Sequence, residues 1–282
     1  MRKHLLSFGH GYSAQALACR LLPSGWKVTG TTRDEKKIIK LRDTGIVPLL
    51  WGDACIEEAF SNVTAVLISV GPSEKGDPVF LRYRNLFEKY AADIDWVGYL
   101  STTGVYGDFG GQWVDEETMP NPQTKRGQLR FHAEKRWQSI PGLPLHIFRL
   151  AGIYGPGRDP FSKVRNGTAK RIIKKGQVFS RIHVDDIAQV LAASLTAPNP
   201  GRIYNVCDDN PAPPQDVVGY AAELLELPLP PIVNFETAEL SPMARSFYAE
   251  NKKVSNTRLK SELGVTLFYP DYKIGLKKIL RE

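Results

Sequence analysis

The chain has 282 residues, of which 42% are hydrophobic and 24% are charged. This is ordinary globular usage, so wholesale disorder, collagen and coiled coil are excluded, and the length suits one large α/β domain or a main domain with a smaller lobe. The formal net charge of +7 favours an anionic ligand. The lysines and arginines are spread along the chain without an aromatic and basic RNA signature, so no nucleic-acid partner is expected.

The cysteines and histidines indicate neither disulfides nor a metal. Cys19, Cys55 and Cys207 lie far apart and are odd in number, which fits no disulfide framework and no Cys-x-x-Cys site. The histidines show no metal-ligand spacing. No apolar run approaches the roughly 20 residues of a membrane helix, and the basic start leads into no signal-peptide core. We therefore expect a cytoplasmic protein with no membrane partner and no metal site.

Short apolar runs alternate with helical stretches in the first two thirds of the chain, a pattern typical of a parallel sheet with crossover helices. Helical periodicity runs from Ala14 to Leu21 and is ended by Pro23 and Gly25. Pro48 would remove a donor from a central strand, so its strand should lie at an edge, where the third strand of a 3-2-1-4-5-6 sheet lies. The predicted strands are 5–8, 27–32, 47–51, 65–70, 96–101 and 145–150.

A glycine-rich turn follows the first predicted strand. Gly9, Gly11 and Ala14 occupy the three defining positions of Gly-x-Gly-x-x-Gly/Ala. The first glycine permits a tight turn, the second lets the backbone approach a pyrophosphate, and the small third residue lets the helix pack on the strand. The amides at Tyr12 and Ser13 would then hold phosphates at the helix N-terminus. With a strand before it and a helix after it, this turn predicts a dinucleotide site.

The end of the second strand bears on the choice of dinucleotide. NAD-specific sites usually carry an acidic side chain there, whereas this chain has Thr32 and Arg33. A hydroxyl followed by a guanidinium could bind a 2′-phosphate, so NADP is favoured over NAD. The alternative is that Arg33 points into solvent or pairs with Asp34 or Glu35.

The pattern loosens after about residue 150, where loops rich in glycine and proline separate short elements. We therefore predict an NAD(P)-binding Rossmann domain over residues 1–150, a doubly wound parallel sheet. Residues 151–282 form a mixed region: a smaller, discontinuous substrate lobe, plus a strand and a helix at about 182–220 that return to the main sheet. Within this region the expected helices are 186–195 and 215–225, and the expected strand is 202–206.

Several motifs, taken in order, resemble the extended short-chain dehydrogenase/reductase superfamily, in particular its NAD-dependent epimerase/dehydratase branch. The matching segments are 9–14, 52–53, 69–72, 101–108, 149–157, 181–186 and 204–206. The resemblance implies that Asp53 lies near adenine and that Thr102 is the catalytic hydroxyl. It further implies that Ser69, Val70, Gly71 and Ser101 lie along the cofactor. Relatives often pair through helices beside the active-site strand, which makes a homodimer an option here.

The chain departs from this family at its catalytic Tyr-x-x-x-Lys pair. Aligning Glu134 with the glutamate that commonly follows the pair puts Arg126 at the tyrosine position and Arg130 at the lysine position. Arg126 could stabilise an oxyanion but could not act as an ordinary acid or base, and Arg130 could still bond the ribose. Four explanations stay open: Tyr106 or Tyr154 takes over, Thr102 acts with water, the alignment is displaced, or hydride chemistry has been lost.

Other segments carry weaker functional hypotheses. Thr103 and Gly104 stand where the family's dehydratases carry an acidic pair, so elimination of the usual kind is disfavoured. His183 with Asp185 is interpreted as a brace between the lobes, and residues 245–248 could cap the substrate cleft. A basic stretch could receive a nucleotide diphosphate or could be simply solvated; it comprises Lys163, Arg165, Lys170, Arg171, Lys174 and Lys175.

These observations predict an atypical NADP(H)-dependent oxidoreductase or epimerase, with NAD as the other cofactor option. Its substrate would be a small or nucleotide-linked sugar, and we expect it to be an anionic or nucleotide-linked small molecule. The rival hypothesis, motivated by Arg126, is a non-catalytic NADP(H)-binding sensor or carrier.

Overall fold

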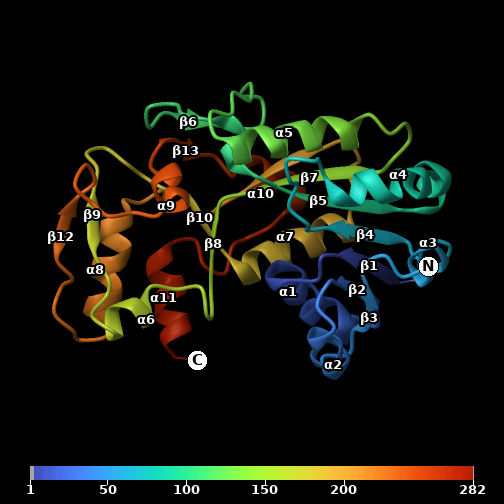
Figure 1. The fold of residues 1–282 in the computed structure, drawn as a ribbon, viewed down its shortest axis with the longest axis horizontal. Coiled ribbons are helices and arrows are strands. Elements are labelled where there is room, and N and C mark those ends of the chain that lie inside the picture. The colour runs from blue at the N-terminus through green and yellow to red at the C-terminus, as the bar shows by residue number, and fades with distance from the viewer. Residues whose placement is uncertain (1–2, 282) are drawn as a thin grey trace.

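The computed structural model describes residues 3–281 and is built around one parallel sheet (Figure 1). Its strand order is β11-β7-β5-β4-β1-β2-β3, and every neighbouring pair is parallel. The predicted doubly wound order is confirmed, with one further strand beyond the sixth. The strands are β1 (His4–Phe8), β2 (Lys27–Thr32), β3 (Val47–Leu50), β4 (Ala65–Ile68), β5 (Trp96–Thr102), β7 (Leu145–Leu150) and β11 (Ile203–Val206).

Helices cover both faces of the sheet, because each strand alternates its buried side chains between two hydrophobic clusters. On β1, Leu5 packs with helices α1 and α7, whereas Leu6 and Phe8 pack with α3, α4 and α5. Figure 1 shows α1 and α7 below the sheet and α4 and α5 above it. These helices are α1 (Tyr12–Leu21), α3 (Cys55–Phe60), α4 (Pro78–Tyr90), α5 (Lys125–Gln138) and α7 (Val184–Thr196), with α2 (Lys36–Asp43) beside β3.

Strand β3 is the edge strand that Pro48 predicts. The amide of Trp51 donates to the carbonyl oxygen of Thr32 on β2. Because alternate residues of a strand point their backbone groups the same way, the amide position of residue 48 faces away from β2. The proline therefore interrupts no hydrogen bond within the sheet.

A smaller lobe lies beside the carboxyl ends of the strands, at the left of Figure 1. Its hydrophobic cluster joins α6, α8 and α11. The return to the main sheet is made by α7 and β11, whereas α8 packs in the small lobe against β9 and α11. The elements of this lobe are α6 (Phe161–Arg165), β9 (Arg171–Ile173), α8 (Pro214–Leu224), β12 (Ile232–Asn234), α9 (Pro242–Phe247) and α11 (Tyr272–Leu280). Helix α10 (Thr257–Leu263) packs on the main sheet, against β11 and α7.

Two short parallel pairs connect the sheet with the small lobe. Strand β8 (Gly152–Tyr154) pairs with β10 (Arg181–His183), and β6 (Trp113–Val114) pairs with β13 (Lys253–Val254). His183 caps helix α7, since its Nδ1 accepts from the amide of Asp185 at 3.2 Å. The His183 ring also packs against the ring of Tyr269, near the C-terminal end, and the two ring centroids are 4.0 Å apart. No helix among residues 3–281 has the length and apolarity needed to cross a membrane.

Candidate functional site

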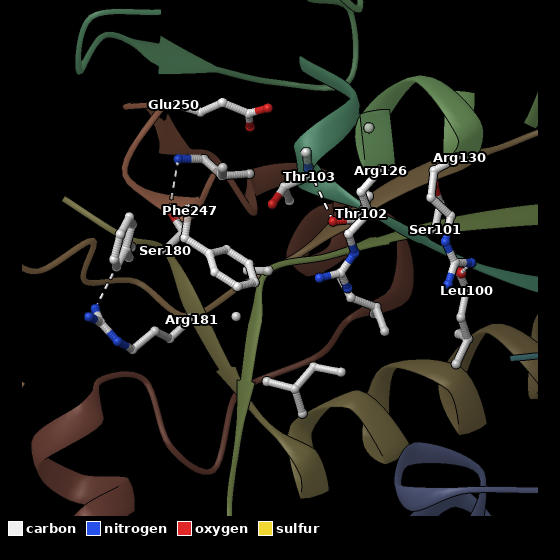
Figure 2. A pocket seen from close by; sticks show the side chains of 18 of the residues that line it. Leu100, Ser101, Thr102, Thr103, Arg126, Arg130, Ser180, Arg181, Phe247 and Glu250 are labelled. Atoms are coloured by element: carbon white, nitrogen blue, oxygen red, sulfur yellow. Dashed lines mark hydrogen bonds between the residues drawn. The ribbon is translucent and has the colours of Figure 1, made fainter. Parts of the chain in front are cut away.

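A cavity of about 750 Å³ lies at the carboxyl ends of the central strands, between the sheet and the small lobe. Its walls come from the α1 N-terminus, the end of β5, the first turns of α5, strand β10 and the segment after α9 (Figure 2). Nine residues that the sequence predicts for the site line it together: Gly9, Gly11, Tyr12, Ser13, Ser69, Ser101, Thr102, Arg126 and Arg130.

The glycine turn forms one end of this cavity. Gly9 has φ +73°, and a Cβ atom there would lie 2.6 Å from Cγ2 of Val70, so only glycine fits. The turn is held by Thr31 Oγ1, which accepts from the Gly9 amide at 2.9 Å, and by Ser69 Oγ, which donates to the Gly9 carbonyl at 2.5 Å. Ala14 lies behind the cavity in the core, as its small size predicts. The first turn of α1 thus directs helix amides toward the cavity.

The small lobe reaches this same end. The Arg158 guanidinium carbon lies 4.5 Å from the ring centroid of Tyr12, and the Tyr12 hydroxyl donates to the carbonyl of Pro156 at 3.0 Å. A positive charge therefore stands beside the helix N-terminus. The sequence motifs did not single out Arg158.

None of the residues predicted for the adenosine end lines the cavity. Thr32 Oγ1 accepts from the amide of Asp34 at 3.1 Å, and Arg33 is exposed. Among residues 3–281, Arg33 forms no ion pair, so of the two alternatives for this side chain it points into solvent and does not pair with Asp34 or Glu35. Asp53 is exposed, and the hydrogen bond from the amide of Cys55 lowers its pKa.

Val70 and Gly71 follow β4 and also lie outside the cavity lining. Val70 packs against the Gly9 turn, and a Cβ atom on Gly71 would lie 3.4 Å from Nη2 of Arg130. These two residues therefore connect the glycine turn with the first turns of α5.

The end of β5 carries two hydroxyls in different settings. Thr102 Oγ1 faces the cavity and accepts from the amide of Gly104 at 3.2 Å. Ser101 is buried, and its hydroxyl donates to Glu134 Oε1 at 2.5 Å. Glu134 in turn forms a buried ion pair with Arg149, Nη2 to Oε2 at 2.8 Å. Ser101 is thus bound to the scaffold, and Thr102 is the hydroxyl available to a ligand.

The two tyrosines considered as replacement acids are both tied into the scaffold. Tyr106 is fully buried and does not line the cavity. Its hydroxyl donates to Asn205 Oδ1 at 2.8 Å and accepts from Arg149 Nη1 at 3.0 Å. Burial raises the pKa of Tyr106 to about 12. Tyr154 lines the cavity, but its hydroxyl donates to the Asp271 carbonyl at 3.3 Å, and burial raises its pKa. The placement of Tyr106 contradicts the idea that it moves into the proton-transfer role.

Arg126 and Arg130 stand one turn apart on α5, and both line the cavity (Figure 2). Arg130 Nη1 donates to the Leu100 carbonyl, which holds it against the end of β5. The Arg126 guanidinium carbon lies 5.8 Å from the ring centroid of Phe247, and Figure 2 shows these two side chains turned toward each other. Burial and the charge of Arg130 lower the pKa of Arg126.

The C-terminal segment contributes residues that the sequence motifs missed. Glu250 and Lys252 line the cavity, although they lie more than a hundred residues from the nucleotide-binding motifs. Of the segment expected to cap the cleft, Ser246, Phe247 and Tyr248 line the cavity, whereas Arg245 turns away to the Ala238 carbonyl. No periodic pattern marks this segment, so nothing in the sequence signalled the acid and the amine.

The cavity lining has an excess of basic side chains, which favours an anionic ligand. The basic stretch predicted from the sequence contributes none of these side chains. None of the six residues of that stretch lines the cavity. The lining instead holds one carboxylate, Glu250, against the five basic residues Arg126, Arg130, Arg158, Arg181 and Lys252. Within residues 3–281 no three His, Cys, Asp or Glu side chains are grouped to hold a metal ion.

Comparisons with known proteins place this architecture in a family. No family model matches the chain. Protein YeeZ of Escherichia coli (strain K12) is 30% identical over 282 residues, covering 95% of this chain and 97% of that protein. The structure of a conserved protein of unknown function from Silicibacter pomeroyi is 56% identical, with a TM-score of 0.95, over 99% of this chain and 98% of that one.

Two further structures carry names from the predicted branch. A candidate NAD-dependent epimerase/dehydratase from Methylobacillus flagellatus is 26% identical, with a TM-score of 0.69, over 100% of this chain and 98% of that one. A human epimerase family protein solved with NADPH shares the fold at 18% identity, with a TM-score of 0.76, over 99% of both chains.

The doubly wound sheet with its cavity at the carboxyl strand ends defines a Rossmann-type α/β protein. The chain belongs to the extended short-chain dehydrogenase/reductase superfamily, as its motifs predict.

Proposed function

We propose that this protein binds NADP(H) and works as an atypical oxidoreductase or epimerase on a sugar or nucleotide-linked sugar. One observation carries the proposal: a single cavity joins the N-terminus of α1 to Thr102, Arg126 and Arg130 at the end of β5. A ligand that fills it can therefore rest its phosphates on the helix amides and still reach a hydroxyl and two guanidinium groups.

The residues of the first strand and turn fit a dinucleotide. Gly9 lets the turn lie close against Val70, where a Cβ atom on residue 9 would collide with the Val70 side chain. The amides of the first turn of α1 face the cavity. Thr32, which ends the strand where NAD-specific sites usually carry an acid, and the exposed Arg33 suit a 2′-phosphate, which favours NADP(H) over NAD(H). By family resemblance, Asp53 would lie beside adenine and residues 69–71 along the cofactor. A bound nicotinamide would supply or accept a hydride at its C4 atom.

The side chains at the other end suit a substrate oxygen. Thr102 can donate a hydrogen bond to that oxygen, and Arg126 can stabilise negative charge on it without releasing its own proton. Arg130, held by the Leu100 carbonyl, can bond the nicotinamide ribose. The excess of basic groups in the lining supports a phosphorylated or nucleotide-linked sugar as substrate.

Calorimetry with NADPH, NADP⁺, NADH and NAD⁺ tests the first half of the proposal. We expect NADPH to bind roughly tenfold or more tightly than NADH, because a charge-assisted hydrogen bond to the 2′-phosphate contributes about 1.5–3 kcal/mol. The second half is tested by deuteride transfer from labelled NADPH across a panel of oxidised sugar nucleotides, with Arg126→Ala as comparison. Absence of heat with all four dinucleotides would refute the proposal.

A second candidate function is a non-catalytic NADP(H) sensor or carrier. The observation that favours it is the pair Arg126 and Arg130, which puts guanidinium groups where an exchangeable phenol and an amine are expected. The same measurements separate the two functions. Tight NADPH binding without deuteride transfer to any member of the panel would support the sensor and contradict the enzyme.

A further inference from the structure

A buried acid and amine face the cavity from the segment after α9. Lys252 Nζ donates to the Gly107 carbonyl at 2.6 Å and to Glu250 Oε2 at 2.6 Å. Glu250 Oε1 accepts from Thr124 Oγ1, the N-cap of α5, at 3.1 Å. The two side chains are only 9% and 10% exposed, so the ion pair is shielded from bulk water yet open to the cavity. An ammonium has three hydrogens, which leaves Lys252 one beyond these two bonds.

The Glu250–Lys252 ion pair lies close to Gly104, which follows the last residue of β5, Thr102, by two positions. A Cβ atom on Gly104 would lie 3.5 Å from Thr102 Oγ1 and 4.0 Å from Glu250 Oε2. One small group can therefore stand between the threonine hydroxyl and the carboxylate. We call this space the Gly104 niche, bounded by Thr102, Gly104, Glu250 and Lys252; Figure 2 shows Glu250 above Thr102 and Thr103.

Proton transfer in the cavity has few other candidates. Among the described residues of its lining, Lys252 is the only primary amine and Glu250 the only carboxyl group. Arginine keeps its proton at any working pH. Tyr106 lies behind the lining, and the hydroxyls of Tyr12 and Tyr154 donate to the carbonyls of Pro156 and Asp271. Tyr248 is the other phenol in the described lining.

We propose that the Gly104 niche receives the reacting oxygen of the substrate and that Lys252 is the proton donor to it. This inference rests on the proposed function and names the acid that the position of Arg126 lacks. When a ketone is reduced, its carbon takes hydride from the C4 atom of NADPH while its oxygen takes a proton from the Lys252 ammonium. The products are an alcohol, NADP⁺ and a neutral Lys252 amine, which then regains a proton from water. Glu250 is the positioning residue that holds the ammonium in the niche.

The test uses the unchanged protein and four variants. Lys252→Arg keeps the positive charge beside Glu250 but does not release a proton, and Lys252→Met removes both the charge and the donor. Gly104→Ala fills the niche with a methyl group at ordinary contact distances. Lys253→Met is the matched control, because it removes the amine of the adjacent residue, which lies 5.9 Å from the ring centroid of Trp113 and outside the cavity lining.

Three measurements are made on each protein: thermal unfolding, calorimetry of NADPH, and calorimetry of UDP-glucose in the presence of NADP⁺. Deuteride transfer to the 4-keto form of a sugar nucleotide follows. We expect NADPH affinity to stay within threefold throughout. UDP-glucose binding should weaken roughly tenfold in Lys252→Met, since a hydrogen bond to a charged group contributes about 1.5–3 kcal/mol. It should weaken by a similar factor in Gly104→Ala, because the added methyl group occupies the niche. Lys252→Arg and Lys253→Met should keep the affinity of the unchanged protein. The kcat of Lys252→Arg should fall roughly 100- to 10,000-fold with KM preserved, the usual size of a general-acid contribution.

The outcomes separate this inference from the proposed function. If NADPH binds and deuteride is transferred, but Lys252→Arg keeps its kcat within threefold, the assignment of Lys252 is overturned and the proposed function stands. UDP-glucose binding that is unchanged in Gly104→Ala overturns the niche by a readout that needs no turnover. Failure of the unchanged protein to bind NADPH, or to transfer deuteride, overturns the enzyme proposal and this inference together.

Discussion

Replacing Arg149 with methionine removes one half of the buried ion pair behind the cavity. Arg149 and Glu134 have side chains only 3% and 1% exposed, joined at 2.8 Å. Burial alone would lower the pKa of Arg149, but the Glu134 carboxylate raises it overall. Methionine fills much of the volume of arginine yet leaves the carboxylate without its counter-ion. Loss of one partner of such a pair costs about 3–5 kcal/mol of the free energy of unfolding.

Urea unfolding of the unchanged protein, Arg149→Met and the double variant Arg149→Met with Glu134→Gln measures this cost. A loss of that size should lower the midpoint of thermal unfolding on the order of 10 °C. The double variant should be more stable than Arg149→Met, because the glutamine carries no unpaired charge. A single variant that loses less than about 1 kcal/mol would refute the reasoning, since an exposed pair contributes no more than that.

Three further predictions follow from positions around the cavity. Gly9→Ala should weaken NADPH binding at least tenfold in calorimetry, because its Cβ atom would overlap Val70, whereas Gly25→Ala, with a similar positive φ and open space, should leave binding unchanged. Arg33→Ala should weaken NADPH binding roughly tenfold and leave NADH binding unchanged; equal losses would contradict a 2′-phosphate contact. Burial raises the pKa of Asp208 from 3.8 to about 8, so the folded protein holds a proton that the unfolded chain releases. Stability should therefore fall as the pH rises from about 4 to about 8, and urea unfolding at pH 5 and pH 8 should show a smaller difference in Asp208→Asn.

The sheet and the glycine turn were predictable because their determinants are local. The strands Lys27–Thr32 and Leu145–Leu150 match the predicted ranges, since short runs rich in β-branched or apolar residues between turn signals are typical of strands. Pro48 identified the edge strand because proline cannot donate in a ladder. The strand predicted over 65–70 ends at Ile68, because the chain turns there and Ser69 bonds the glycine turn.

The site beyond the glycine turn depends on contacts between distant segments, and these left little trace in the sequence. Strand β13, which leads Lys252 to the cavity, pairs with β6 across about 140 residues, and each strand has only two residues. The basic stretch resembles an anion site in sequence, yet Lys174 lies outside the cavity lining and its Nζ donates to the Tyr248 carbonyl. Tyr106 follows β5 closely, but the turn after Thr102 buries it against Asn205. Side-chain direction in such turns is decided by packing.

Pro48 also bears on the behaviour of the protein in concentrated solution. The outer side of β3 is the place where a second chain could add a strand, by aligning its carbonyl groups with outward amides. The imino nitrogen of Pro48 offers no hydrogen there, so an incoming strand meets a gap in the middle of a four-residue edge. This end of the sheet is thereby protected against strand-mediated aggregation without any cost to the hydrogen bonds that hold β3 in place.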